Sequence, residues 1–112
     1  MNPSKAKGTR WESRLLPHLQ TVFPYAERAP LRGTQDRGDF VHTGPFTVEA
    51  KNCKALDLAG WIDEARAEAR RAGGLWPVVV FPRRSHATER AYVVMELETW
   101  LSVAHRLETD GR

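Results

Sequence analysis

The chain has 112 residues, of which 41% are hydrophobic and 28% are charged, and its formal net charge is +3 with an isoelectric point near 9.4. This balance is typical of one folded domain, and it argues against a disordered chain and against the extreme positive charge of a histone-like DNA binder. The single cysteine excludes an intrachain disulfide and a zinc site built from several cysteines.

The sequence gives no sign of membrane insertion or secretion. No apolar run approaches the roughly 20 residues that a membrane-spanning helix needs. The basic residues at the N-terminus are not followed by the apolar segment of a secretory signal. We therefore expect one domain over residues 1–112 that works in the cytoplasm, with a flexible basic arm over 1–7 and a flexible tail over 108–112.

A first helix is expected over residues 9–23, where apolar residues recur at helical spacing and Pro17 predicts a kink. Placing residues at about 100° intervals puts Glu12 inside the apolar arc of this helix. A carboxylate that faces a core is costly unless it meets a cation or a hydrogen-bond donor. Glu12 is therefore expected either to form a salt bridge or to help hold a metal ion.

The next segment predicts a short strand, a loop and a hairpin. A strand is expected over 25–29, and the long polar loop over 30–38 is of the kind that often carries function. Strands over 39–42 and 46–51 flank the turn-forming residues 43–45, so we expect them to pair as a hairpin.

The second half of the chain continues with helix, strand, strand and helix. The second helix is expected to start at the N-cap Asp57 and to stop at Gly73-Gly74. Strands are expected over 75–81 and 91–95, and a final helix from Leu97. The order α-β-β-β-α-β-β-α predicts a fold of the broad α/β class. More specifically, it predicts an α+β arrangement in which helices pack on the faces of a mixed sheet. The four tryptophans, Trp11, Trp61, Trp76 and Trp100, are expected to pack in the core.

The predicted hairpin places two acids face to face. A three-residue turn would bring Asp39 directly opposite Glu49, with β-carbons about 5 Å apart. Lys51 lies two residues after Glu49, so both side chains leave the same face of the strand. Two carboxylates this close repel each other unless a cation lies between them, and hard oxygen ligands suit Mg²⁺ or Mn²⁺.

This arrangement has the parts needed to hydrolyse a phosphodiester. The backbone carbonyl of Ala50 could supply a further metal ligand, and Lys51 could orient or deprotonate the attacking water. The ordinary alternative is a surface ladder of ion pairs in which Lys51 neutralises Asp39 and Glu49. A Glu-x-Lys triplet alone is common, so the hypothesis depends on its combination with Asp39, with the inward Glu12 and with the surrounding arginines.

The combination resembles the PD-(D/E)XK nuclease superfamily, and most closely the archaeal Holliday-junction resolvases and the resolvase-like endonucleases of phages. The resemblance is carried by residues 7–12, 37–40, 48–52 and 78–80. It implies a restriction-endonuclease-like core in which Asp39, Glu49 and Lys51 are the metal and catalytic residues and Glu12 completes the site. Glycine occupies the position before Asp39, where the name of the motif has proline.

Clustered basic residues and the polar loop provide candidate DNA contacts. In the resolvases a serine-bearing loop precedes the acid, and Thr34 is the hydroxyl residue of the corresponding loop here. The candidate DNA-binding residues are Lys5, Lys7, Arg10, Arg32, Thr34, Gln35, Arg37, Arg83 and Arg84.

The leading hypothesis is therefore a Mg²⁺-dependent DNA endonuclease, selective for branched DNA such as Holliday junctions. A domain with one such centre would need a homodimer to cut two strands, as the resemblance also implies. If the chain is encoded by a phage, it would act in the host cytoplasm. Two alternatives stay open: a less selective nuclease that nicks, degrades or restricts DNA, and a non-catalytic nucleic-acid-binding protein on a nuclease scaffold.

Overall fold

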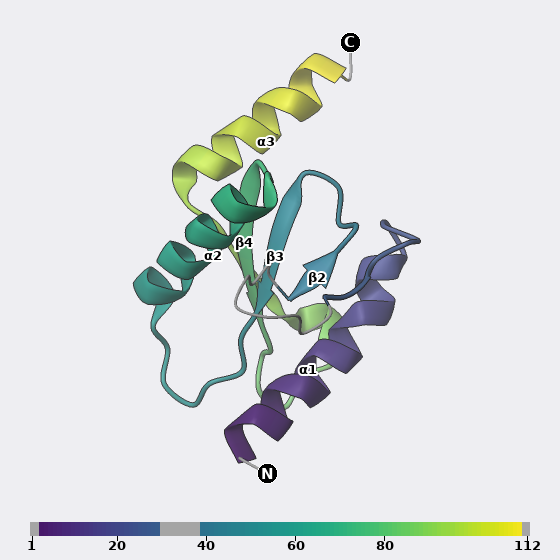
Figure 1. Cartoon of the computed structure of the whole chain (residues 1–112), viewed down its shortest axis with the longest axis vertical. Coiled ribbons are helices and arrows are strands. Elements are labelled where there is room, and N and C mark those ends of the chain that lie inside the picture. The colour runs from purple at the N-terminus through teal and green to yellow at the C-terminus, as the bar shows by residue number, and fades with distance from the viewer. Residues whose placement is uncertain (1–2, 30–38, 111–112) are drawn as a thin grey trace.

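The computed structural model describes the backbone of residues 3–29 and 39–110, with side chains from residue 8 onward in these ranges. Within them the chain forms a mixed α+β fold with three α-helices, a short 3-10 helix and five strands in two small sheets (Figure 1). The element order expected from the sequence is confirmed. No helix in the described part of the chain is long and apolar enough to cross a membrane.

The helices are close to their predicted positions. Helix α1 begins ahead of the expected start at residue 9, and Pro17 lies inside it without ending it. Helix α3 continues to Asp110, through the first part of the expected tail. The helices are α1 (Pro3–Gln20), α2 (Leu58–Ala72), η1 (Thr88–Arg90) and α3 (Leu97–Asp110). The strands are β1 (Glu27–Arg28), β2 (Phe40–Val41), β3 (Phe46–Ala50), β4 (Trp76–Phe81) and β5 (Tyr92–Val94).

The ends of helix α2 are fixed by the residues that the sequence indicated. The side chain of Asp57 accepts a hydrogen bond from the backbone N–H of Gly60, which satisfies a donor of the first turn. At the other end Gly73 adopts the left-handed conformation, at φ 72°, and its N–H donates to the carbonyl of Ala69. Both capping predictions are confirmed.

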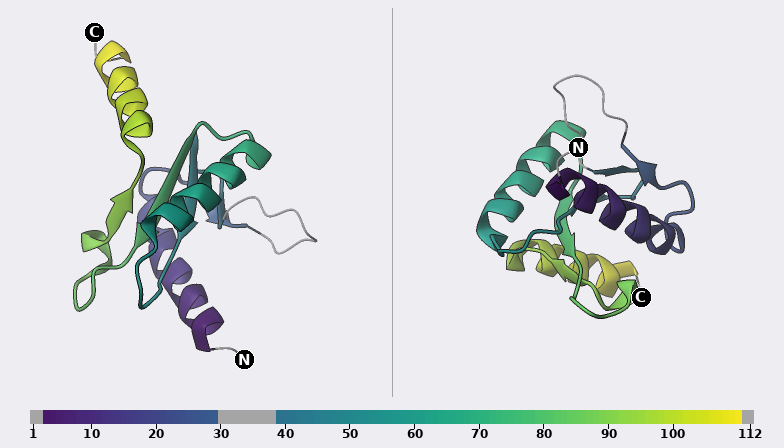
Figure 2. Two further views of the ribbon diagram at one scale, coloured as in Figure 1. Left: turned by 90° about the vertical axis from the view of Figure 1, so that its left-hand side faces the viewer. Right: turned by 90° about the horizontal axis from the view of Figure 1, so that it is seen from below.

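The larger sheet has the order β3-β4-β5, with β3 parallel to β4 and β5 antiparallel to β4. Helices α1 and α2 cover opposite faces of this sheet (Figure 2). Val48 and Val80 pack toward Trp11 of α1, whereas Val79 packs toward Trp61 of α2. Glu49 alternates with Val48 and is registered with Val79, so its side chain leaves the sheet on the side of α2.

The expected hairpin is not formed. Strand β2 pairs antiparallel with β1, while β3 pairs with β4. His42 has φ 62° and Gly44 has φ 61°, so the chain leaves the extended conformation directly after β2. Thr43 closes the connection locally, because its hydroxyl donates to the carbonyl of Phe46 and its own carbonyl accepts from the N–H of Phe46.

One core prediction is wrong. Trp11 and Trp61 are buried and Trp76 is partly buried, but Trp100 is 55% exposed. Helix α3 extends away from the sheet toward the end of the molecule opposite to α1 (Figures 1 and 2). Helix α3 does carry the predicted apolar stripe, but much of this stripe is not covered by any described residue.

Candidate active site

Asp39 lies beside the free edge of β3. Its Oδ2 accepts a hydrogen bond of 2.6 Å from the backbone N–H of Ala50. The opposite edge of β3 is occupied by β4, so this N–H faces away from the sheet and takes the Asp39 carboxylate in place of a neighbouring strand. The contact ties the start of β2 to the C-terminal end of β3.

Glu49 is a buried acid next to this contact, with only 6% of its surface exposed. Its side chain interacts with that of Asp39, and this interaction lowers the pKa of Asp39. The two acids thus lie next to each other, as the hypothesis from the sequence requires. They are brought together by the hydrogen bond between Asp39 and the N–H of Ala50, because strands β2 and β3 do not pair as a hairpin.

The position of Asp39 changes its acidity. Burial raises the pKa of the Asp39 carboxyl from its ordinary value of 3.8 to about 6. The N–H of Ala50 opposes this rise, the negative charge of Glu12 adds to it, and Lys51 and the hydrogen bond with Glu49 oppose it. The Asp39 carboxyl therefore keeps its proton up to about pH 6, at the place where a divalent cation could replace it.

This shift predicts a pH-dependent stability of the metal-free protein. The pKa of Asp39 is higher in the folded protein than in the unfolded chain, so the associated stability is complete below pH 3.8 and is lost as the pH rises through about 6. The loss amounts to at most about 3 kcal/mol. Urea unfolding in EDTA should show Asp39→Asn gaining stability relative to wild type from pH 4.5 to pH 8. A difference that stays constant with pH would contradict the raised pKa.

Lys51 is paired with a residue that the sequence hypothesis did not include. Its Nζ lies 2.7 Å from Oε2 of Glu64 on helix α2. Burial lowers the pKa of Lys51, but the hydrogen bond and charge of Glu64, together with the charges of Glu49 and Asp39, outweigh it and raise the pKa above its usual value. Lys51 is therefore a firmly protonated cation at neutral pH.

A signal for Glu64 was present in the sequence. On a helical projection from Trp61, Glu64 falls at about −60° and Glu68 at about −20°, along one border of the apolar stripe of α2. An acid at the border of a buried face lies close to the sheet that this face covers. The projection alone does not identify Lys51 as the partner.

Glu12 forms a salt bridge, which was one of the two roles predicted for it. Its Oε2 accepts hydrogen bonds of 2.7 Å and 3.1 Å from Arg28 in strand β1. Its charge nevertheless raises the pKa of Asp39, so the α1 acid lies within electrostatic reach of the carboxyl pair. Glu12 thus borders the site while its carboxylate is held by Arg28.

The metal hypothesis must be compared with what the structure shows. Across residues 3–29 and 39–110, no three side chains of histidine, cysteine, aspartate or glutamate are grouped so that they could hold a metal ion. The residues that would hold Mg²⁺ are Asp39 and Glu49, with the carbonyl of Ala50. Two carboxylates fit this ion, because Mg²⁺ usually keeps several of its waters and takes only one or two carboxylates from a protein.

The predicted DNA contacts are only partly described. Arg10 is exposed on α1, Arg83 is partly buried in the loop after β4, and Arg84 is exposed beside it. The residues that lie outside the described part of the structure are Arg32, Thr34, Gln35 and Arg37, together with the side chains of Lys5 and Lys7.

Comparison with protein-family models, with curated proteins and with solved structures found no match for this chain.

Proposed function

We propose that the chain is a Mg²⁺-dependent DNA endonuclease that hydrolyses phosphodiester bonds. The observation that supports this best is the pair of neighbouring acids Asp39 and Glu49, held by the N–H of Ala50, with the charged Lys51 next to it, at the C-terminal end of β3. Ligand sites of sheets with parallel strands commonly lie at the carboxyl ends of those strands. The resemblance to the PD-(D/E)XK superfamily supports the same reading, with a restriction-endonuclease-like core as its expected fold.

In this proposal each residue has a defined task. When bound, Mg²⁺ supplies charge stabilisation at the phosphate and acidifies a bound water. Asp39 and Glu49 would hold the ion in their deprotonated forms, and the N–H of Ala50 keeps Asp39 in place. Lys51 is protonated at neutral pH, so it orients the water and stabilises the charge on the phosphate oxygens, and it is not the base that removes a proton.

The substrate is proposed to be branched DNA such as a Holliday junction. The test is incubation with labelled junction, flap, duplex and single-stranded DNA and Mg²⁺. Preferred cleavage of the junction supports resolution, and equal rates on junction and linear duplex would indicate the less selective nuclease. DNA binding without cleavage of any substrate would indicate the non-catalytic binder. The proposed location is the cytoplasm, or the cytoplasm of the host if a phage encodes the protein.

Calorimetry with Mn²⁺ tests the metal site without relying on cleavage. Wild type should bind Mn²⁺ and release protons at pH 6, because the carboxyl pair must deprotonate to bind the ion. Glu49→Gln should bind at least about tenfold more weakly, since it removes one of two charged ligands. Equal heats for both proteins would contradict the proposed ligands.

Glu64 is proposed as a positioning residue for Lys51. Glu64→Gln removes the charge that helps to raise the pKa of Lys51, so the alkaline limit of cleavage should move to lower pH. The maximal rate should fall by roughly tenfold, as for loss of a residue that orients a catalytic group. Full pH profiles of the cleavage rate measure both effects. Arg66 is also on α2 and forms a salt bridge with Glu96, which precedes α3. Glu96→Gln is therefore the control and should leave the pH profile unchanged.

We also propose that the chain acts as a homodimer, because each copy has one centre and a junction requires two cuts. The uncovered apolar side chains of β5 and α3 favour this, since large exposed apolar patches mark interaction surfaces. They are Tyr92, Val93, Leu97, Trp100, Leu101 and Leu107. Sedimentation analysis should show a dimer for wild type and a monomer for Leu101→Glu. A monomeric wild type would contradict the proposal.

A further inference from the structure

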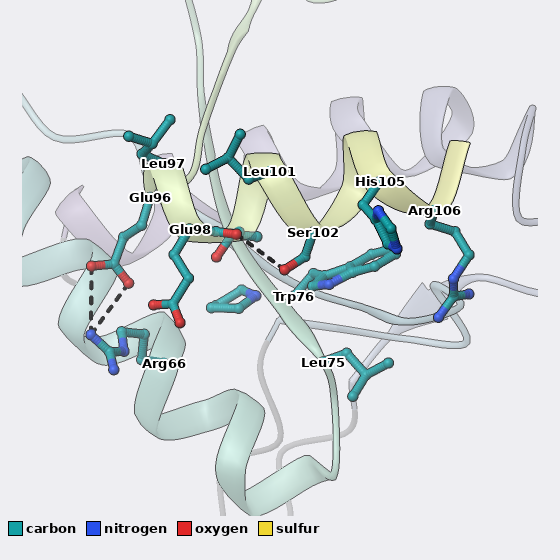
Figure 3. A pocket seen from close by; sticks show the side chains of 12 residues that line it. Arg66, Leu75, Trp76, Glu96, Leu97, Glu98, Leu101, Ser102, His105 and Arg106 are labelled. Atoms are coloured by element: carbon teal, nitrogen blue, oxygen red, sulfur yellow. Dashed lines mark hydrogen bonds and ion pairs between the residues drawn. The ribbon is translucent and has the colours of Figure 1, made fainter. Parts of the chain in front are cut away.

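The hollows of the described surface include two that lie outside the carboxyl pair. The larger, of about 930 Å³, runs between α3 and the start of β4 and is bordered by Trp76, Leu101 and Arg106 (Figure 3). It contains both acids and bases, so its lining favours no particular ligand charge. The smaller, of about 300 Å³, lies between α1 and the loop that follows β4. The smaller hollow has a clear chemical preference.

The described residues that line the smaller hollow are basic or uncharged, and none of them is an acid. Arg14, Arg83, Arg84 and His86 border it, together with Asn52 and hydroxyl groups. The salt bridges between described residues involve none of the three arginines. Guanidinium groups that no carboxylate neutralises are suited to phosphate, which they bind through paired N–H donors.

The position of Arg14 is fixed by its contact with Trp11. The guanidinium carbon of Arg14 lies 5.4 Å from the centre of the Trp11 ring, within the range of a cation–π interaction. Trp11 is itself immobilised, because it is 1% exposed and its Nε1 donates to the carbonyl of Val80 over 3.2 Å. The contact therefore favours one position of the exposed Arg14 side chain before any ligand arrives, which lowers the entropy cost of binding.

The loop that carries Arg83 and Arg84 is also held by internal contacts. The backbone N–H of His86 donates to the carbonyl of Arg83, and the Nδ1 of its ring lies 2.8 Å from the carbonyl of Arg84. Because a carbonyl only accepts, this contact requires the tautomer with a proton on Nδ1. These contacts hold the loop as a turn on the side of the hollow opposite to Arg14.

The hollow adjoins the proposed active site through the backbone. The carbonyl of Val80 that accepts from Trp11 also accepts from the N–H of Lys51 over 3.0 Å. Asn52, the next residue after Lys51, lines the hollow. The carboxyl pair and the basic hollow thus lie at the C-terminal ends of the two parallel strands β3 and β4, on either side of Lys51-Asn52.

We propose that this hollow binds a phosphate of the DNA strand that is cut, next along the backbone from the phosphate at Asp39 and Glu49. The inference deepens the proposed nuclease function and rests on it for the identity of the strand. Arg14, Arg83 and Arg84 supply the charge, and Asn52 adds an amide donor. Such a contact fixes the register of the strand and carries no base specificity.

The test is binding of a fluorescein-labelled, single-stranded abasic deoxyribose-phosphate oligomer in EDTA, followed by anisotropy over a range of salt concentrations. This probe offers phosphates without bases, and EDTA removes any contribution of the metal. Arg14→Gln should weaken binding about five- to tenfold at low salt and reduce the slope of log K against log salt by about 0.7, the value for one contact to a single strand. Arg83→Gln/Arg84→Gln should reduce both further.

Arg106→Gln is the matched control, because Arg106 lies over the ring of Trp76 at 5.3 Å, much as Arg14 lies over Trp11. It should change binding by less than twofold. Equal effects of Arg14→Gln and Arg106→Gln would overturn the phosphate site, whether or not wild type cuts DNA. Loss of binding confined to the hollow variants, with no cleavage of any DNA by wild type and Mg²⁺, would support the phosphate site and reject the nuclease function.

Discussion

Glu49→Gln is expected to reduce the rate of DNA cleavage by at least about 10³-fold, equivalent to about 4 kcal/mol of transition-state stabilisation. The substitution keeps the size of the side chain and removes one of the two charged ligands proposed for Mg²⁺. Glu49 is 6% exposed and lies next to Asp39, so the substitution changes the charge inside the proposed site itself. Single-turnover rates with saturating enzyme measure the effect on the chemical step.

The matched control for this prediction is Glu68→Gln. Glu68 is as buried as Glu49, also at 6% exposure, and forms a salt bridge with Arg71 on helix α2. A general effect of replacing a buried acid would slow both variants alike, whereas the proposed site predicts a large loss for Glu49→Gln alone. Binding of junction DNA in EDTA should be unchanged in Glu49→Gln. A variant that cuts within tenfold of wild type would reject Glu49 as a catalytic residue.

Trp11→Ala is expected to lower the free energy of unfolding by about 3–5 kcal/mol, the usual cost of truncating a buried aromatic side chain. Trp11 is packed between α1 and the sheet with Leu15, Val48 and Val80, and the substitution also removes its hydrogen bond to the carbonyl of Val80. Urea unfolding at pH 7 gives the change as a shift of the midpoint.

Trp100→Ala makes the same truncation at a side chain that is 55% exposed. At protein concentrations where the chain is monomeric, it should cost less than about 1 kcal/mol, because little of the side chain leaves an apolar environment. A similar loss in both variants would show that α3 is covered in the folded monomer, and would contradict its exposed placement.

Much of the local structure could be predicted because its causes are local. The uninterrupted apolar run in 76–81 and the helical spacing in 58–72 locate β4 and α2, and Asp57 and Gly73 mark the ends of that helix. The inward position of Glu12 also follows from spacing along one helix. In each case the controlling interactions lie within a few residues along the chain.

The remaining features depend on contacts between distant segments. The sequence does not show that His42 adopts a positive φ and turns β2 away from β3, because a left-handed histidine has no separate signature. It also gives no pairing of Glu12 with Arg28 or of Lys51 with Glu64, since both partners come from other elements. The stripe of α3 indicates an apolar face but does not identify what covers it.

The carbonyl of Val80 has a mechanical consequence. By accepting from both the Trp11 ring and the backbone of Lys51, it fastens helix α1 and the end of β3 to one point on the central strand. Glu12 and Arg14 follow Trp11 on the helix, and Lys51 and Asn52 directly follow β3. A displacement of α1 caused by a ligand at Arg14 would therefore reach the backbone of Lys51 through the carbonyl oxygen of Val80, so the two segments are expected to move together.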